Sequence, residues 1–454
     1  MMKVEVVSKE SIKPSSPTPH HLKFFKLAFL DQLAPPIYVN VLLYYSHNDN
    51  AEKIIDADTR RSVIKTSLAE TLTKFYPLAG KIIDDEFVVD CNDEGVDYTE
   101  TKVSNGSLSQ LIQHPNVHEL VKKFLPSDPY STDTSSKKVP LLVQVNVFED
   151  CGGIVIGLRI SHKLADASSL TNFVNDWATV ARGIAAGDHG EQIKGPSFDW
   201  QSRFPPRDLM GFKPTSLIVG DEVLVTKKFV FGASKLDELK AKSIIVKESD
   251  DASDRYQPTR VEVLTAFLWK SFIDIDQAKN KGSVLPKVYL ATHTVNVRSR
   301  MVPSLPTNSF GNVLGISAAS IVMNNTGTEK NDQYNYPNLV GEVRDSIKKV
   351  DADYVDVVQT TDAQLIAFKS MSQASASGQA LMLNFSSWCR FPIYEADFGW
   401  GKPTWVSTAA LAMQNMVMLM DTSSGDGIEA WVHLSTKDMA EFERHEELLA
   451  SILN

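Results

Sequence analysis

The sequence predicts an α/β (α+β) protein built from two sheet-based lobes of similar size. Apolar runs of strand length alternate with segments of helical periodicity along the whole chain. A chain of 454 residues exceeds a single ordinary hydrophobic core. Residues 183–214 hold four prolines and five glycines with little apolar periodicity, which marks a linker. We therefore expect an N-terminal lobe over residues 1–195, a crossover linker over 196–214 and a C-terminal lobe over 215–454.

The first half alternates strands and helices. Short runs rich in β-branched and aromatic residues predict strands at residues 4–7, 37–45, 82–90, 95–101, 141–148 and 153–161. Apolar residues recur at helical spacing over residues 59–75 and again from Leu170 onward, where Gly183 marks a stop. A polar loop is expected at residues 127–138.

The second half repeats this alternation. Strands are predicted at residues 223–231, 288–295 and 380–385, and helices at 234–243, 258–273, 341–350, 362–372 and 436–453. Pro258 suits a first helical turn, and Ser435 with Asp438 three residues later has the spacing of a capping box. Residues 324–337 predict a surface loop.

Composition excludes several classes of function. The net charge of −10 and a pI near 5.5 argue against a nucleic-acid partner. Three widely spaced cysteines make neither a disulfide framework nor a CxxC site, so a reducing compartment is expected. No secretory signal or run long enough to span a bilayer is evident. We expect a cytoplasmic protein that does not bind membranes.

A histidine lies where a predicted strand ends and a helix begins. His162 follows the strand at 153–161, and Asp166 suits the helix N-cap. By itself the pair has three interpretations: coincidence with an N-cap, a metal site with ligands four residues apart, or a general base. A metal site lacks support, because there is no HExxH motif and the remaining histidines offer no suitable spacing. The pair alone does not decide among them.

A second motif, Asp397-Phe398-Gly399-Trp400-Gly401, lies more than two hundred residues downstream. Taken alone, its glycines indicate a tight structural turn beside a large ring. Together, SHKLAD and DFGWG resemble the plant BAHD acyl-CoA-dependent acyltransferases. The resemblance covers nearly the whole chain and includes LAETLTKFYPLAGK at 68–81, SFGN at 309–312 and SSWCRFPIYEADFGWGKP at 386–403.

Within that family the chain looks most like the alkaloid-acylating branch. The runs KPSSPTP at 13–19 and LDQL at 30–33 are also similar to that branch, whereas Ala167 stands where many other members have glycine. The resemblance implies a monomer of two chloramphenicol-acetyltransferase-like lobes, with the catalytic histidine midway along a solvent channel between them. It also implies acyl-CoA as co-substrate entering from one face, the acceptor from the other, and no metal or permanently bound cofactor.

The resemblance assigns roles to individual residues. His162 is the general base, and Asp166 turns away from it to form a structural pair with Arg298. Ser386 and Trp388 correspond to a hydroxyl and an indole beside the reacting carbonyl, where they would stabilise an oxyanion. For Trp388 a core aromatic is the alternative. A structural role is expected for Asp397.

Substrate-binding residues are harder to predict. A basic cluster contains Lys228, and it could bind CoA phosphates or be a solvated helix face; its members are Lys227, Lys228, Lys235, Lys240, Lys242 and Lys247. Thr259, at the start of a predicted helix, could lie near the phosphates or pantetheine. The acceptor pocket is expected near Tyr38, Phe310 and Phe391, with ordinary core packing as the alternative.

The sequence thus predicts an acyl-CoA-dependent O-acyltransferase. We expect it to move an acetyl group from acetyl-CoA to a hydroxyl of a plant specialised metabolite, an alkaloid, through a ternary complex. The alternatives are transfer of a hydroxycinnamoyl or longer acyl chain to an alcohol or amine, and a non-catalytic family member that binds CoA or a metabolite.

Overall fold

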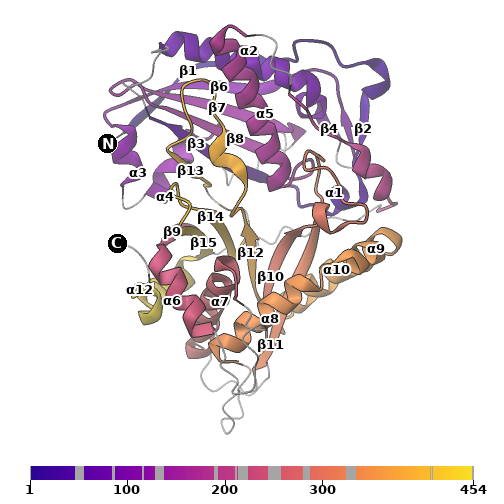
Figure 1. Ribbon diagram of the computed structural model, residues 1–454, viewed down its shortest axis with the longest axis vertical. Coiled ribbons are helices and arrows are strands. Elements are labelled where there is room, and N and C mark those ends of the chain that lie inside the picture. The colour runs from indigo at the N-terminus through magenta and orange to yellow at the C-terminus, as the bar shows by residue number, and fades with distance from the viewer. Residues whose placement is uncertain are drawn as a thin grey trace. The chain divides into compact units, whose positions relative to one another are not determined.

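The computed structural model describes residues 2–46, 56–83, 87–114, 117–127, 138–188, 193–209, 212, 223–243, 257–279, 287–323, 334–409, 411 and 413–451. The chain divides into two compact units (Figure 1). The first comprises residues 1–216, 305–313 and 391–412, and the second comprises 217–304, 314–390 and 413–454. Each unit contains a six-stranded sheet with helices, so the predicted α/β class with two sheet-based lobes is confirmed.

The large sheet of the first unit has the strand order β1-β6-β7-β8-β3-β13. Its strands are β1 (Lys3–Ile12), β6 (Val96–Ser104), β7 (Leu141–Phe148), β8 (Ile154–Ser161), β3 (Tyr38–Tyr45) and β13 (Trp405–Ser407). Neighbours are antiparallel except β6 and β7. Every residue of β7 and β8 is buried, as their apolar runs predict.

A smaller sheet of the same unit has the order β2-β5-β4. Its strands are β2 (Phe24–Lys26), β5 (Val88–Asp90) and β4 (Lys81–Ile83). The single strand predicted at residues 82–90 is therefore two short strands. They pair with each other and β5 also pairs with β2.

Two long helices, α2 (Ala57–Lys74) and α5 (Ala167–Ala186), pack against each other (Figure 1). The indole of Trp177 donates a hydrogen bond to the Ser67 hydroxyl at 3.0 Å between them. The predicted stop of α5 at Gly183 is wrong by one turn. The helix ends at Gly187, whose φ of +76° gives the left-handed conformation that glycine tolerates at a C-cap.

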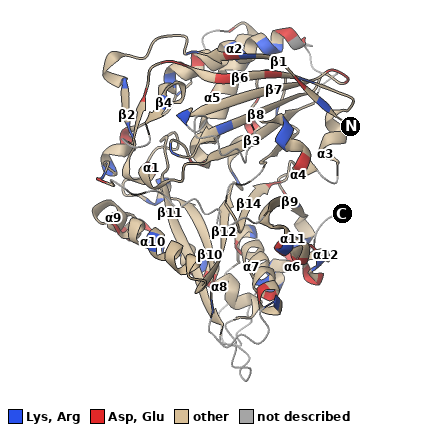
Figure 2. Cartoon of the chain, turned by 180° about the vertical axis from the view of Figure 1, so that it is seen from behind, with Lys and Arg blue, Asp and Glu red and all other residues tan. Residues whose placement is uncertain are grey.

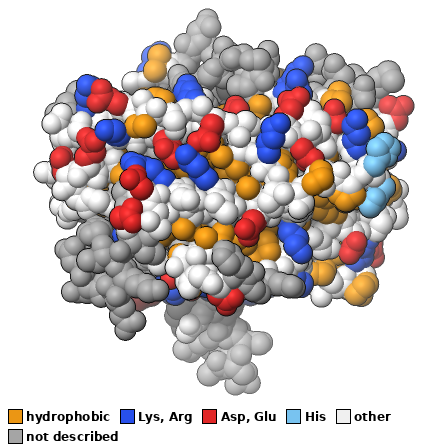
Figure 3. All heavy atoms as spheres, turned by 90° about the horizontal axis from the view of Figure 1, so that it is seen from above, with side chains coloured by type: hydrophobic (Ala, Val, Ile, Leu, Met, Phe, Trp, Pro, Cys, Tyr) orange, Lys and Arg blue, Asp and Glu red, His pale blue; other side chains and the backbone are white. Residues whose placement is uncertain are grey.

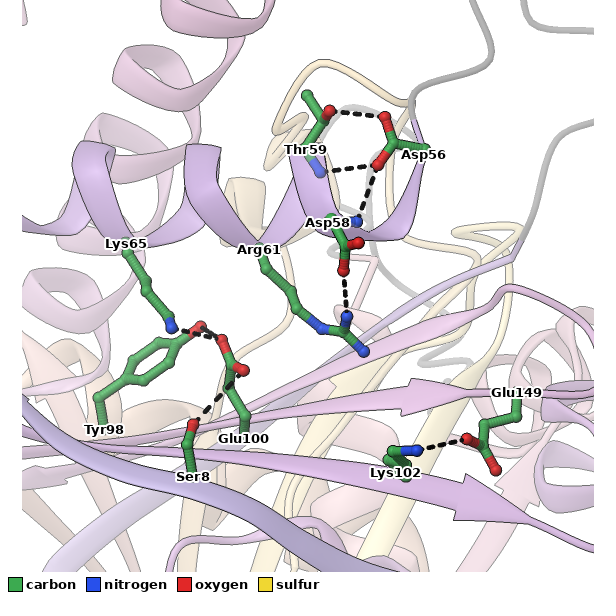
Figure 4. A network of polar contacts seen from close by, with 10 residues as sticks. All are labelled: Ser8, Asp56, Asp58, Thr59, Arg61, Lys65, Tyr98, Glu100, Lys102 and Glu149. Atoms are coloured by element: carbon green, nitrogen blue, oxygen red, sulfur yellow. Dashed lines mark hydrogen bonds and ion pairs between the residues drawn. The ribbon is translucent and has the colours of Figure 1, made fainter.

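A polar network ties α2 to the edge of the large sheet (Figure 4). Lys65 on α2 forms ion pairs with Glu10 of β1 at 2.7 Å and Glu100 of β6 at 2.8 Å. Ser8 of β1 also donates to Glu100 at 3.4 Å. Glu100 is buried, and these partners compensate for the burial of its charge.

The large sheet of the second unit has the strand order β11-β10-β12-β14-β15-β9. Its strands are β11 (Leu314–Met323), β10 (Lys287–Asn296), β12 (Ala380–Ser387), β14 (Met416–Asp421), β15 (Ile428–Ser435) and β9 (Leu224–Phe231). The two pairs that contain β12 are parallel, and the others are antiparallel.

Helices of the second unit build its hydrophobic core with this sheet. The helix α7 (Arg260–Lys279) contributes nine of its 20 residues to this core, Trp269 among them. The helices α6 (Ala233–Ser243) and α8 (Tyr336–Lys348) pack against α7. Among the described residues of this unit, the other helices of eight or more residues are α9 (Ala352–Thr360), α10 (Ala363–Ala376) and α11 (Thr436–Arg444). The helix predicted at 436–453 is interrupted at His445 and resumes as α12 (Glu446–Leu449).

The predicted division differs from the compact units. We placed the DFGWG motif in the C-terminal lobe, but Asp397–Gly401 belongs to the first unit because β13, just after it, pairs with β3. Part of the predicted linker is structured: residues 199–203 form a short 3₁₀ helix with Trp200 buried. Most of the predicted loop at 127–138 and most of that at 324–337 lie outside the described residues.

Charges of both signs are intermixed over the elements of both units and on the face seen from above (Figures 2 and 3). Across the described residues, no helix combines the length and apolar character that a membrane crossing requires.

Candidate active site

His162 is held by its backbone at the end of a buried strand. It follows β8 directly, and its N–H donates to the carbonyl of Ile37 at 2.9 Å. Its own carbonyl accepts a hydrogen bond from Nδ2 of Asn312 at 2.7 Å. Ile37 and Asn312 both belong to the first unit, so His162 is held by contacts within that unit.

The imidazole of His162 also contacts Asn312. Its Nδ1 lies 2.9 Å from Oδ1 of that side chain. The amide Nδ2 of Asn312 already donates to the His162 carbonyl and to the Asp31 carboxylate, at 2.7 and 2.9 Å. Rotating the amide by 180° would set its oxygen against both of these acceptors, so the orientation is determined.

This orientation determines the tautomer of His162. Because Oδ1 of Asn312 can only accept, Nδ1 of His162 must carry a hydrogen, and Nε2 then carries the lone pair. Burial lowers the pKa of His162 from its ordinary value. A neutral imidazole with a basic Nε2 is the form that removes a proton from a hydroxyl.

Asn312 is a site residue that sequence reasoning missed. It is 150 positions from His162 in the chain, and it is buried. The SFGN run at 309–312 contributed to the family resemblance, but nothing in its composition indicates a contact with the histidine. The run is docked by Ser169, whose hydroxyl bonds to the N–H and the carbonyl of Gly311, each at 2.9 Å.

Asp166 begins α5 as the sequence predicts. Its Oδ1 accepts from the N–H of Ser169 at 2.8 Å, and its Oδ2 accepts from the N–H of Val313 at 3.1 Å. The carboxylate is buried and joins the helix start to residues 305–313. These contacts favour a structural role over a dyad with His162.

Arg298, the predicted partner of Asp166, is buried in the second unit. Its backbone N–H and Nη1 both contact Oδ1 of Asn296, at 3.1 and 3.2 Å. The pairing of Asp166 with Arg298 would join the two units, and it stays a prediction.

Ser386 and Trp388 lie together at the carboxyl end of β12 in the second unit. The Ser386 hydroxyl accepts from the Thr294 hydroxyl at 3.4 Å. Trp388 is buried, and its backbone N–H donates to the Leu419 carbonyl at 2.7 Å. The structure thus brings the hydroxyl and the indole to one end of a strand, while their role toward an oxyanion stays a prediction.

Asp397 shapes the DFGWG turn. Its Oδ1 accepts from the N–H groups of Gly399 and Gly401, at 2.8 and 2.9 Å. Both glycines have φ values above +100°, which other residues rarely adopt. Phe398 packs edge-on against Trp177 of α5 at 5.0 Å. These contacts favour the structural role that we expected.

The basic cluster of the second unit is largely neutralised by acidic neighbours. Lys228 lies 3.8 Å from Glu429, and four other members form ion pairs: Lys227 with Glu443, Lys235 and Lys242 with Glu238, and Lys240 with Asp237. Lys247 lies outside the described residues. The contacts favour a solvated surface over a phosphate site.

A cavity of about 460 Å³ in the same unit is a stronger candidate for phosphate binding. It is lined by Glu262, Arg300, Arg344, Ile347, Lys348, Val350, Asp351 and Ala352. Thr259 lies beside it, because its N–H and hydroxyl exchange hydrogen bonds with Glu262 at 2.8 and 3.2 Å. Sequence reasoning missed the three cationic side chains, of which Arg344 and Lys348 lie one turn apart on α8 and Arg300 comes from residues 298–300.

The three predicted acceptor-pocket residues all lie in the first unit. The Tyr38 hydroxyl donates to the Val139 carbonyl at 2.5 Å. Phe310 is buried and packs against the rings of Phe75 and Phe198, so core packing describes it better than a pocket wall. Phe391 is half-buried at the start of a short 3₁₀ helix.

No cluster of three or more His, Cys, Asp or Glu that could hold a metal ion occurs among the described residues.

Two sheet-based units and a half-buried histidine that follows a buried strand can be compared with proteins of known fold. The crystal structure of vinorine synthase has the same fold: the TM-score is 0.82 at 35% identity, over 99% of this chain and 98% of that one. The Transferase family model matches residues 2–449. The chain therefore belongs to this family, the BAHD acyltransferases, and the resemblance carried by SHKLAD and DFGWG is confirmed.

Characterised plant enzymes are similar over nearly their full length. Stemmadenine O-acetyltransferase of Catharanthus roseus is 37% identical, over 96% of this chain and 95% of that enzyme. Vinorine synthase of Rauvolfia serpentina is 36% identical with the same coverage. A limonoid 21-O-acetyltransferase of Melia azedarach is also 36% identical, over 99% of this chain and 98% of that enzyme.

Proposed function

We propose that this enzyme transfers an acetyl group from acetyl-CoA to a hydroxyl of a plant specialised metabolite. The observation that carries the proposal is the 2.9 Å contact between Nδ1 of His162 and the amide oxygen of Asn312, which leaves Nε2 to act as a base. The relatives named above support the donor and the reaction, because two of them are O-acetyltransferases.

In this mechanism Nε2 of His162 accepts the acceptor's hydroxyl proton as its oxygen attacks the thioester carbonyl. The resulting tetrahedral species carries its negative charge on the former carbonyl oxygen. The C–S bond then breaks, the ester forms, and the proton on Nε2 passes to the CoA thiolate. General-base catalysis of this kind typically contributes about 10²–10⁴-fold.

Ser386 and Trp388 are proposed to stabilise the oxyanion, through the hydroxyl and the indole N–H. Preorganised donors are most effective where charge develops during the reaction. Their common position at the end of β12 supports this assignment, since one strand end positions both groups.

The phosphates of acyl-CoA are proposed to bind at the cavity beside Thr259. Arg300, Arg344 and Lys348 place three positive charges on its lining against the two carboxylates of Glu262 and Asp351, which leaves a net charge of +1. Such a local cationic site is what an anionic substrate requires from a chain with a net charge of −10. Lys228 is assigned at most a peripheral role, because Glu429 lies beside it.

The acceptor is proposed to be an alkaloid. The relatives' names include both stemmadenine and a limonoid, so terpenoid alcohols belong in the same screen. The enzyme is further proposed to act as a cytoplasmic monomer, with neither a metal nor a bound prosthetic group.

The test is CoA release from acetyl-CoA, followed with a thiol reagent, against alkaloid, terpenoid and phenolic alcohols. Release that depends on an acceptor supports the proposal and begins to name the substrate. Release only with longer-chain or hydroxycinnamoyl thioesters of CoA would show that one of these, and not acetyl-CoA, is the donor. Binding of CoA without transfer from any donor would favour a non-catalytic member of the family.

A further inference from the structure

A short helix beside the active site is buried along its whole length. All five residues of α1 (Phe29–Leu33) are buried, including the polar Asp31 and Gln32. Burial of polar groups is costly unless they are hydrogen-bonded. The hydrogen bonds of these two side chains therefore show which neighbouring residues the helix positions.

Asp31 is bound to the residue that holds His162. Its Oδ1 accepts from the N–H of Asn312 at 2.8 Å and from Nδ2 of the same residue at 2.9 Å. Its Oδ2 accepts from the N–H of Ala28 at 3.2 Å. Asn312 thus donates to Asp31 on one side and accepts from His162 on the other.

Gln32 and Lys163 lock α1 in place. The Gln32 side chain exchanges hydrogen bonds with the backbone of Arg207, at 3.0 and 3.1 Å. The buried Lys163 ammonium donates to the Gln32 carbonyl at 3.0 Å. Asp31 is therefore carried on a helix that is anchored to the loop next to the histidine and to residue 207.

We propose that Asp31 is a positioning residue for His162 that acts through the side chain of Asn312. Its carboxylate fixes the direction of the Asn312 amide, and this direction selects the Nδ1–H tautomer of the imidazole. Its negative charge also polarises that amide. The amide oxygen then stabilises the imidazolium formed when Nε2 takes up a proton.

Other charges act on the same imidazole. Lys163 opposes protonation of His162, and Asp166 favours it. On the other side of Asn312, burial raises the pKa of Asp31 to about 7, and the three N–H donors oppose that rise. Arg207 lies over the ring of Phe29 on the same helix, 3.6 Å from the ring centre. Because substitution of Asp31 leaves these neighbours in place, its own contribution can be isolated.

The catalytic part of this inference rests on the proposed function and is tested with Asp31→Asn, which keeps shape and removes charge. We expect kcat to fall about tenfold or more while KM changes less than about twofold, because the lost stabilisation arises only during the reaction. Burial raises the pKa of Asp31 to about 7, above the lowered pKa of His162, so the acid limb of kcat/KM in the wild type should include the loss of this carboxylate's charge. Asp31→Asn removes that titration, so the acid limb should move to lower pH, where His162 titrates.

Two further variants separate this effect from a structural one. Gln32→Asn loosens the same buried helix without changing charge, so it should reduce thermal stability and leave the acid limb in place. In an Asn312→Ala background, adding Asp31→Asn should produce no further shift of that limb. An acid limb that moves equally in Gln32→Asn, or that still moves in the Asn312→Ala background, would overturn the proposal.

Nitrogen NMR of histidine-labelled protein tests the tautomer without any turnover. We expect Nδ1 of His162 to be protonated in the wild type, and an Nε2–H tautomer would refute the inference. This readout remains decisive if Asp31→Asn fails to fold. If the wild type transfers no acyl group, the proposed function fails. A pH titration of the His162 nitrogen signals in the wild type and in Asp31→Asn still decides whether Asp31 acts on His162.

Discussion

Gly311 shows how closely the segment that carries Asn312 is packed. A Cβ atom at this position would lie 2.2 Å from Cζ2 of Trp200, and the residue has a φ of +146°. The indole N–H of Trp200 donates to the carbonyl of Phe310 at 2.8 Å, so the ring cannot easily withdraw. Only glycine satisfies both the space and the backbone at this position.

Gly311→Ala should therefore lower the free energy of unfolding by about 2 kcal/mol or more, through overpacking and strain. Gly341→Ala is the matched control, because Gly341 lies inside α8 with ordinary φ and open space where the added methyl group would stand. That change should stabilise the protein by about 0.5–1 kcal/mol. Equal effects in denaturant unfolding would show that Gly311 is not constrained as described.

At this scale the sequence predicts the base but not its partner. His162 is recognisable because a buried strand precedes it, an N-cap follows it and a second motif supports the family. Asn312 and Asp31 are not recognisable. Asn312 contacts His162 across 150 positions of the chain, and Asp31 contacts Asn312 across 281 positions. No local sequence pattern encodes contacts at such separations.

At the scale of single elements, the N-cap residue of α5 forms hydrogen bonds both within and outside its own helix. Asp166 accepts from Ser169 within the helix and from Val313 outside it. By contrast, Asp351 caps the exposed start of α9 with a single bond to the N–H of Tyr354 at 3.0 Å. The two residues form a natural pair for comparison.

Asp166→Ala should cost about 2–4 kcal/mol of unfolding free energy, because it removes a cap and leaves buried donors unpaired. Asp351→Ala should cost about 1 kcal/mol, as expected for an exposed cap. Asp166→Asn keeps one acceptor oxygen and sets its NH2 group against the other N–H donor, so it should retain only part of the stability and of the activity. Calorimetry in which the two alanine variants lose stability equally would contradict the account of Asp166.

Elements differ in how well the sequence predicts them. The strands β7 and β8 match their predictions closely, because both are buried on two faces and read as continuous apolar runs. The strand β11, with its small residues and alternating burial, and β14, rich in methionine, were not predicted. Composition of this kind carries little intrinsic strand preference, so pairing within the sheet decides the conformation.

At the scale of the whole molecule, the distribution of charge should determine where the anionic donor substrate binds. The chain is acidic overall, yet Arg300 and two cations of α8, Arg344 and Lys348, line one cavity beside Glu262 and Asp351. Arg344 is within 3.7 Å of Glu262, and the Arg300 guanidinium donates to the carbonyls of Ile347 and Val350. The exposed Lys348 is therefore the cation that can be removed with least damage to the fold.

Lys348→Ala should raise the KM for acetyl-CoA several-fold at low salt, with kcat nearly unchanged, because it removes an attraction common to substrate and transition state. The difference from wild type should shrink as ionic strength rises. Lys242→Ala, in an exposed ion pair of α6, is the control and should leave KM unchanged. An unchanged KM in Lys348→Ala would show that the phosphates bind elsewhere.

The measurement that tests the central claim most directly is acceptor-dependent CoA release by wild type and by His162→Ala, at a common pH and saturating acetyl-CoA. Removing a general base should reduce kcat by about a hundredfold or more. Both proteins should unfold at similar temperatures and bind CoA alike. If the variant releases CoA as fast as the wild type, His162 is not the base, and the account of the site is wrong.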